Sequence, residues 1–148
     1  NDDFAGSFAG IPGLGIDIMS QTGSTIGPNP NDPKNPDLGP NGLQNYPVLT
    51  KVVPKSGSVT VSGTLNSAKS TTFTVELFSN DFCNPYKYGE GQQPLGTIAV
   101  KTDAKGAGDF QATFAQPLKH AQYITATATT PATTTGGGTS EFSKCERI

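Results

Sequence analysis

The chain contains no tryptophan, one methionine, one histidine and two cysteines, and these scarcities narrow what the protein can be. With a single histidine, zinc sites of the common type have no support. The sequence contains no GxSxG nucleophile elbow that could pair with that histidine, His120, so a Ser-His-Asp triad is unsupported as well. No catalytic constellation is visible, and we expect the chain not to be an enzyme.

Long apolar runs and clusters of basic residues are also missing. No stretch approaches the ~20 apolar residues that span a bilayer, so we expect no membrane insertion. No Lys/Arg cluster is present that would neutralise a row of phosphates, which argues against nucleic-acid binding. The net charge of −2 is unevenly distributed, because residues 1–46 hold five acids and one lysine. Negative charge is therefore concentrated at the front of the chain.

Composition divides the chain into two unequal parts. Residues 1–46 are rich in Gly, Pro, Asn and Asp, whereas residues 47–148 alternate apolar and polar side chains. A length of 148 residues suits one domain with an appendage. We therefore assign residues 47–148 to a folded domain and residues 1–46 to an irregular junction that precedes it.

Period-two alternation predicts seven short strands in the second part. In residues 58–65, for example, Val59, Val61 and Leu65 share one face, which is typical of a half-buried antiparallel strand. The predicted strands are residues 48–53, 58–65, 71–79, 95–102, 109–114, 123–129 and 139–144. The strands at 95–102 and 109–114 are expected to form a hairpin across a glycine-containing turn. The pattern predicts an all-β protein, a seven-stranded Ig-like β-sandwich.

The two cysteines, Cys83 and Cys145, are too far apart in the sequence for a CxxC redox or zinc pattern. An even count in a Thr/Ser/Gly-rich β protein favours one disulfide and an oxidising compartment. The alternative is a pair of unpaired cysteines in a cytosolic domain.

The stretch NPNDPKNPDLGPN, residues 29–41, is the most suggestive of metal chemistry. Carboxylate and amide oxygens are the hard ligands that Ca²⁺ prefers, and it takes six to eight of them. The candidate ligands are Asp17, Asp32, Asn35, Asp37 and Asn41. The spacing is not that of an EF-hand, because the glutamate at the twelfth position is missing. The alternative is a loop in which Asn and Asp form Asx-turns beside proline.

The excursion between the third and fourth predicted strands, residues 80–94, holds a second group of candidates. Aromatic rings beside amide and carboxylate groups stack on sugars or contact a protein partner. The candidate ligand-binding residues are Tyr86, Tyr88, Glu90 and Gln92. In the alternative interpretation, the two tyrosines pack beneath a loop that Cys83 fastens to Cys145.

Five runs of sequence, taken in order, resemble one family. They are GLGIDI (13–18), DLGPNGLQNYPVLT (37–50), GSVTVSGTLNSAKSTTFTVELFSN (57–80), FCNPYKYGEGQQPLGT (82–97) and ITATATTPATTTGGGTSEFSKC (124–145). They resemble the C-terminal end of secreted bacterial proteins built on right-handed parallel β-helix repeats, sometimes called CSLREA-type after an upstream motif absent here. In that family an LGIDL-like rung closes the β-helix. A GPN-LQN-aromatic-P-V-L junction then leads into an Ig-like module that ends in T-SEFS-C.

The resemblance implies an extracellular or cell-surface protein in which residues 1–46 are the terminal rung of a β-helix and its junction. It also implies a non-catalytic sandwich. We expect this module to cap the solenoid edge and to present loops for adhesion to a glycan or a host or matrix protein. The alternative function is an accessory, carbohydrate-binding module of a β-helix enzyme that degrades polysaccharides. Asn35 stands where the family commonly has a further Asp, which weakens the inference of metal binding. The connection before the last predicted strand is longer than in the family, which weakens inferences about loop contacts.

Overall fold

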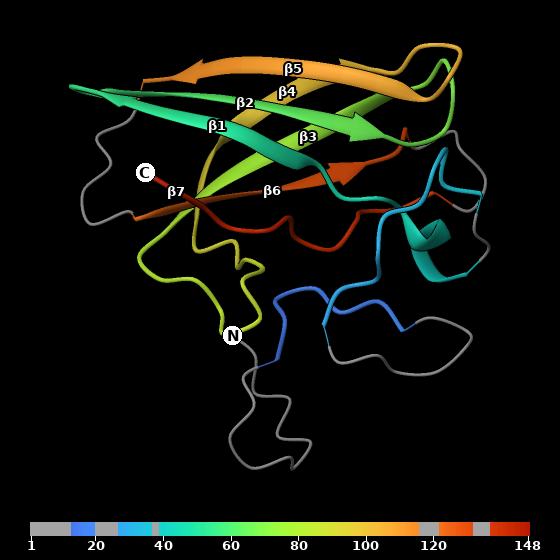
Figure 1. Ribbon diagram of the computed structural model, residues 1–148, viewed down its shortest axis with the longest axis horizontal. Coiled ribbons are helices and arrows are strands. Elements are labelled where there is room, and N and C mark those ends of the chain that lie inside the picture. Colours follow the sequence, from blue (N-terminus) through green and yellow to red (C-terminus); the bar gives the residue numbers. More distant parts are fainter. Residues whose placement is uncertain (1–12, 20–26, 37–38, 116–121, 132–136) are drawn as a thin grey trace.

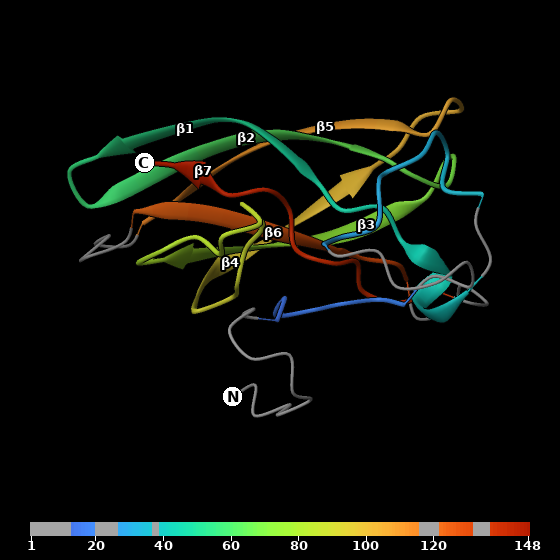
Figure 2. The same ribbon diagram turned by 60° about the horizontal axis from the view of Figure 1, so that its bottom comes forward.

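The computed structural model describes residues 13–19, 27–36, 39–115, 122–131 and 137–148. Two antiparallel sheets lie face to face, with strand orders β1-β2-β5 and β4-β3-β6-β7 (Figures 1 and 2). The elements are η1 (Pro40–Leu43), β1 (Val48–Lys55), β2 (Ser58–Asn66), β3 (Thr72–Asn80), β4 (Gln93–Lys101), β5 (Ala107–Phe114), β6 (Tyr123–Thr129) and β7 (Glu146–Arg147). The expected all-β, seven-stranded sandwich is confirmed.

The core lies between the two sheets and follows from the alternation in the sequence. On β2, Val59 and Val61 are fully buried, and on β3, Phe73 and Val75 are fully buried as well. Each such side chain contributes roughly 1.5–3 kcal/mol through its removal from water. Because successive residues of a strand point to opposite faces, the polar residues between them face outward. The sandwich is therefore a consequence of the period-two pattern.

The predicted hairpin between the fourth and fifth strands is wrong, because β4 pairs with β3 and β5 pairs with β2. The chain crosses between the sheets through a turn in which Asp103 Oδ1 accepts hydrogen bonds from Lys105 N (2.7 Å) and Ala107 N (2.9 Å). This turn is joined to the connection before β3, because Thr102 Oγ1 donates to Ala68 O at 2.6 Å. A short glycine-containing turn thus carries the chain from one sheet to the other, where Phe110 completes the core.

The predicted strand at residues 139–144 is also wrong in its form, since β7 comprises only Glu146–Arg147. The preceding segment runs beside β6, but two serine hydroxyls replace part of the backbone ladder. Ser140 N donates to Ala128 O while Ser140 Oγ accepts from Ala128 N, both at 2.9 Å. Ser143 forms the same pair of bonds with Ala126, at 2.8 and 2.9 Å. Because a side chain supplies the acceptor in each pair, regular strand geometry is lost over these residues.

The outer face of the β4-β3-β6-β7 sheet is partly covered, which the alternation on β6 did not indicate. Thr125 is fully buried, and its Oγ1 donates to Glu90 O (2.6 Å) and accepts from Asn80 Nδ2 (3.0 Å). Residues 13–19 also pass on the outer side of this sheet, as both views show (Figures 1 and 2). The excursion and the junction therefore meet on one side of the sandwich.

Candidate functional site

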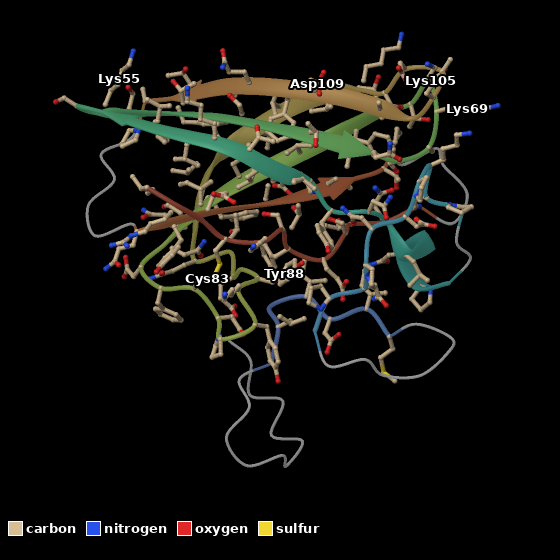
Figure 3. All side chains as sticks on the ribbon, viewed as in Figure 1. Lys55, Lys69, Cys83, Tyr88, Lys105 and Asp109 are labelled. Carbon is tan, nitrogen blue, oxygen red and sulfur yellow. A yellow bond between two sulfur atoms is a disulfide. The ribbon has the colours of Figure 1, made fainter. Side chains whose placement is uncertain are left out.

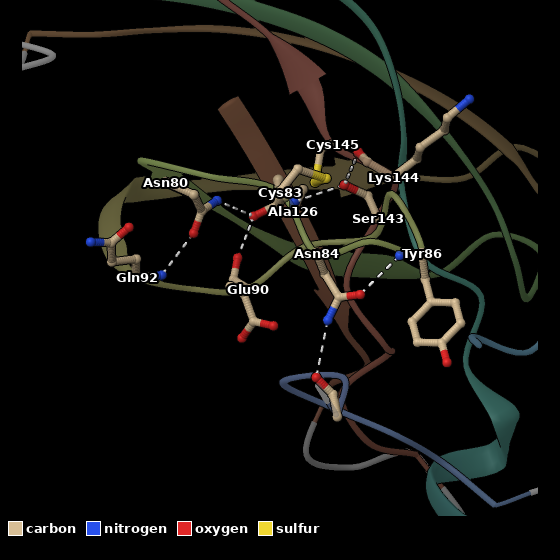
Figure 4. Close-up of a disulfide and its surroundings, with 12 residues drawn as sticks. Asn80, Cys83, Asn84, Tyr86, Glu90, Gln92, Ala126, Ser143, Lys144 and Cys145 are labelled. Carbon is tan, nitrogen blue, oxygen red and sulfur yellow. Dashed lines mark hydrogen bonds between the residues drawn. A yellow bond between two sulfur atoms is a disulfide. The ribbon is translucent and has the colours of Figure 1, made fainter. Parts of the chain in front are cut away.

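A disulfide between Cys83 and Cys145 fastens the excursion to the end of the chain, as the cysteine count favoured. The two Cα atoms are 6.2 Å apart, and the residues are separated by 62 positions in the sequence. Beside the disulfide, Cys145 N donates to Lys87 O at 2.9 Å and Gly89 N donates to Ser143 O at 3.1 Å. The excursion is therefore held both by the sulfur bridge (Figure 4) and by backbone pairing.

The two tyrosines of the excursion occupy different environments. Tyr88 packs edge-on against Tyr46, with ring centroids 5.6 Å apart, and the two hydroxyl groups are 3.4 Å apart. Burial raises the pKa of the Tyr46 hydroxyl, and the hydrogen bond with Tyr88 raises it further. Tyr86 is half-buried, and its ring points away from the disulfide (Figure 4). Tyr88 therefore joins the excursion to the junction, whereas Tyr86 faces elsewhere.

The other two candidates of the excursion also have partners within the chain. A Cβ added at Gly15 would lie 2.9 Å from Glu90 Oε2, so the Glu90 carboxylate lies against the junction. Gln92 closes the excursion, because its Oε1 accepts from Asp81 N at 2.9 Å and its Nε2 donates to Asp81 Oδ2 at 3.1 Å. Tyr88, Glu90 and Gln92 therefore contact different parts of the chain.

Sequence reasoning missed the most exposed apolar side chain of the excursion. Phe82, adjacent to the disulfide, is 65% exposed. The disulfide already restrains the backbone next to this phenylalanine. A partner that binds the ring would therefore order little additional backbone, so the entropic cost of binding would be low. The signal was a phenylalanine between polar residues and a cysteine in a loop, where no strand alternation accounts for it.

The junction is attached to the sandwich by a buried carboxylate that sequence reasoning did not single out for this role. Glu141 is only 3% exposed. Its Oε1 accepts from Ile18 N at 2.9 Å, and its Oε2 accepts from Asn29 N at 2.6 Å. Asn29 Nδ2 in turn donates to Ile18 O, so the two junction segments are also joined to each other. One side chain thus holds two separate segments of backbone against the sandwich.

Burial raises the pKa of the Glu141 carboxyl, and the hydrogen bonds from Ile18 and Asn29 lower it only in part. The nearby carboxylate of Asp17 raises it further. For an acid whose pKa is raised on folding, ionisation favours the unfolded state, so its contribution to stability falls as the pH rises through that pKa. The two backbone donors offset this cost, which makes them necessary partners of the charged form.

Asparagine side chains continue the attachment toward β1. Asn31 pairs with the backbone of Tyr46 in both directions, because its Nδ2 donates to Tyr46 O (2.8 Å) and its Oδ1 accepts from Tyr46 N (3.0 Å). Asn45 is 2% exposed, and its Nδ2 donates to Asp32 O (2.6 Å) and Asn66 O (2.7 Å). These amides take the place of a backbone ladder in a segment that proline prevents from forming one.

The predicted calcium ligands lie in different surroundings. Asn35 Oδ1 accepts from Asn45 N at 3.0 Å, and Asn41 Nδ2 donates to Thr139 O at 3.1 Å. Asn35 and Asn41 both have positive φ, at 50° and 52°, a conformation that asparagine tolerates better than most residues. Asp32 is half-buried, Asp17 is exposed, and Asp37 lies outside the described residues.

The described residues contain no group of three or more His, Cys, Asp or Glu side chains arranged to hold a metal. The hydrogen bonds of Asn35 and Asn41 reach residues 10 and 98 positions away in the sequence, so they are not the local Asx-turns of the alternative interpretation. Calcium binding stays a prediction.

Residues 13–15 of the predicted rung lie against the excursion. Asn84 Nδ2 donates to Gly13 O at 3.1 Å, a bond drawn in Figure 4. A Cβ at Gly15 would meet Phe142 Cε2 at 3.1 Å as well as Glu90, which explains why glycine occupies that position. The junction, the excursion and residues 140–143 (SEFS) therefore contact one another in one region of the molecule.

In the described part of the chain, no helix is long and apolar enough to cross a membrane. A comparison with protein-family models finds no match, and a comparison with curated proteins finds none either.

Proposed function

We propose that the chain is a non-catalytic, extracellular or cell-surface Ig-like module that caps a β-solenoid and presents the excursion loop for adhesion. The observation that carries this proposal is the attachment of the junction through Glu141. A carboxylate that binds the backbone of Ile18 and of Asn29 fixes the direction in which a preceding segment enters the sandwich. Such a fixed entry suits a terminal cap, which must continue the geometry of the last repeat.

The burial pattern of the junction supports a role at the end of a solenoid. Ile18 is buried against the sandwich, whereas Asp17 and Met19 on either side are exposed. Met19 is 67% exposed, which is unusual for a residue of this type. Rungs of a β-solenoid join edge to edge through backbone hydrogen bonds, and successive residues of an extended segment direct their N–H and C=O groups to alternate edges. Ile18 directs its N–H to Glu141 and its C=O to Asn29. The backbone groups of Asp17 and Met19 would therefore point to the opposite edge, where a preceding rung would lie.

Amide hydrogen exchange tests the capping function. In this chain we expect the Ile18 amide to exchange slowly, because it donates to Glu141, and the amides of Asp17 and Met19 to exchange rapidly. In a longer chain that carries preceding β-helix rungs, the last of these rungs would protect the Asp17 and Met19 amides as well. If the Asp17 and Met19 amides exchanged as rapidly in the longer protein as in this chain, the capping function would be contradicted.

The adhesive role of the loop predicts that Phe82 dominates binding to immobilised extracellular-matrix proteins. Phe82→Ser removes the exposed ring next to the disulfide and is expected to weaken binding about tenfold or more, as central aromatic anchors do. Val48→Ser is the matched control, because Val48 is also a large exposed apolar residue, at 49%, but lies on β1. Surface plasmon resonance measures both. Equal affinities of the two variants would place adhesion elsewhere.

A second function, an accessory carbohydrate-binding module of a β-helix polysaccharide-degrading enzyme, is favoured by a different observation. The β1-β2-β5 sheet has an open, shallow hollow on its surface, and hydroxyl, amide and carboxylate side chains are among the groups that line it. Mixed donors and acceptors of this kind match the hydroxyl groups of a sugar. The hollow is remote from the excursion, so the two functions use different surfaces.

A further inference from the structure

The hollow lies where β1, β2 and β5 run side by side, on the face of the sheet that points away from the core. It has a volume of about 470 Å³. Its lining residues are Thr50, Ser62, Gly63, Thr64, Asp109, Phe110 and Gln111. In Figure 3, Asp109 lies at the opposite side of the molecule from Cys83 and Tyr88. The hollow is therefore separate from the excursion and the junction.

The floor of the hollow is the backbone of β2 and β5, where Gly63 stands opposite Phe110 in the ladder. Gly63 lies on the core side of β2, in line with the buried Val61 and Leu65. A Cβ there would lie 2.5 Å from Phe110 Cζ and 2.8 Å from Val48 O, so no side chain fits. The Phe110 ring is therefore on the core side of the floor.

The rim of the hollow includes a residue displaced by a β-bulge. The register between β1 and β2 shifts between Leu49 and Lys51, which leaves Thr50 without a partner in the ladder. A bulge of this kind re-aims a side chain and leaves backbone groups of the bulged residue unused by the ladder. Thr50 therefore adds a hydroxyl to the hollow beside those of Ser62 and Thr64.

The opposite rim comes from β5. Thr64 stands opposite Asp109, and Ser62 stands opposite Gln111. Gln111 Nε2 donates to Ser62 Oγ at 3.0 Å. This bond orients the Gln111 amide and does not use its oxygen. Asp109 is exposed and supplies the one carboxylate of the lining. A carboxylate accepts hydrogen bonds from two neighbouring hydroxyl groups at once.

The chemistry of the lining selects among classes of ligand. An anionic ligand would meet the carboxylate of Asp109, and an apolar peptide would bury several hydroxyl groups without partners. A neutral sugar avoids both problems. It carries no negative charge, and its hydroxyl groups donate to Asp109 and exchange hydrogen bonds with the threonine and serine hydroxyls. Its apolar face would rest on the backbone of β2 and β5 that forms the floor.

We propose that this hollow, with Thr50, Thr64, Asp109 and Gln111 at its rim, is a binding site for one neutral sugar unit of a glycan. The site rests on the second function above for its class of ligand, and it is independent of the cap and of the excursion loop. It differs from the predicted site at Tyr86 and Tyr88, because it lies on the outer face of a sheet and holds no exposed aromatic ring.

Titration of the whole chain with neutral sugars tests the proposal. The probes are glucose, galactose, mannose, N-acetylglucosamine and their β-linked disaccharides, each followed by ¹H–¹⁵N NMR at concentrations up to about 10 mM, which detects millimolar affinities. At least one probe is expected to shift the amides of residues 62–64 and 109–111. Asp109→Ala should weaken that binding about tenfold or more, through the loss of a charged hydrogen-bond acceptor.

The matched control is Thr113→Ala, on the same face of β5. Thr113 pairs with Thr60 through hydroxyl groups 2.8 Å apart, and neither residue lines the hollow. This variant should retain the affinity within about twofold, since nothing at the rim changes. The proposal is overturned if no probe shifts these amides, or if Asp109→Ala and Thr113→Ala bind alike. Shifts confined to residues 81–92 would overturn it too, and would assign sugar binding to the excursion instead.

Discussion

Replacing both Cys83 and Cys145 with serine is expected to lower the free energy of unfolding by about 4 kcal/mol. The disulfide closes a loop between residues 62 positions apart, and the chain-entropy model assigns roughly that value to a loop of this length. The loss is large because most small domains have a total stability of only about 5–15 kcal/mol. Urea unfolding at equilibrium measures it, as a lower midpoint with a steeper slope, because the unfolded chain without the crosslink exposes more surface.

The reduced wild-type chain is the control for this double substitution. Reduction removes the same crosslink without changing any side chain to serine, so the two proteins should unfold at similar urea concentrations. The backbone pairing between residues 87–89 and 143–145 should also loosen in both, which the amide exchange of Cys145 or its serine replacement would show. If the oxidised and reduced wild-type chains had the same midpoint, the disulfide would not contribute to stability.

Glu141→Ala is expected to release the junction while the sandwich remains folded. The substitution leaves the buried N–H groups of Ile18 and Asn29 without their acceptor, and hydrogen bonds to a charged group contribute about 1.5–3 kcal/mol each. We therefore expect the amides of these two residues to lose protection equivalent to roughly 3 kcal/mol or more. Hydrogen exchange measures this directly, with the core amide of Val75 as the internal reference for the sandwich.

Two further substitutions isolate the role of the carboxylate. Glu141→Gln retains one acceptor oxygen and places an NH₂ group against the other backbone donor, so it should give an intermediate loss of protection. Glu146→Ala removes a half-buried glutamate from β7, five positions along the chain, and should leave Ile18 and Asn29 protected. Unchanged exchange of both amides in Glu141→Ala would refute the attachment and, with it, the main support for the capping function.

The strands were most predictable where burial repeats every second residue, as it does on β2, β3 and β5. Val59, Val61, Phe73 and Val75 follow this period, and each is fully buried. The last predicted strand failed because Ser140 and Ser143 bond to β6 through their hydroxyls, an option that a hydrophobic pattern does not record. The hairpin failed for a related reason: a turn with glycine is compatible both with a hairpin and with a crossing between sheets.

Predictions about the candidate sites depended on which groups find partners in space. Asn35 and Asn41 have the ligand atoms that calcium prefers, but the structure places these amides in hydrogen bonds to Asn45 and Thr139. Tyr88 was a candidate for contact with a ligand and instead packs on Tyr46 from the junction. In each case the alternative partner is distant in the sequence, so local chemistry alone did not identify it.

The sequence by itself determined the class of fold and the covalent link, because period-two burial needs only neighbouring residues and two cysteines allow only one intramolecular pairing. The tertiary structure decided which strands pair, where Glu141 is buried, and that a bare glycine on β2 lies over the ring of Phe110. These features depend on contacts between residues far apart in the chain. Their energies are set by desolvation and by hydrogen-bond partners, which exist only once the sheets have packed.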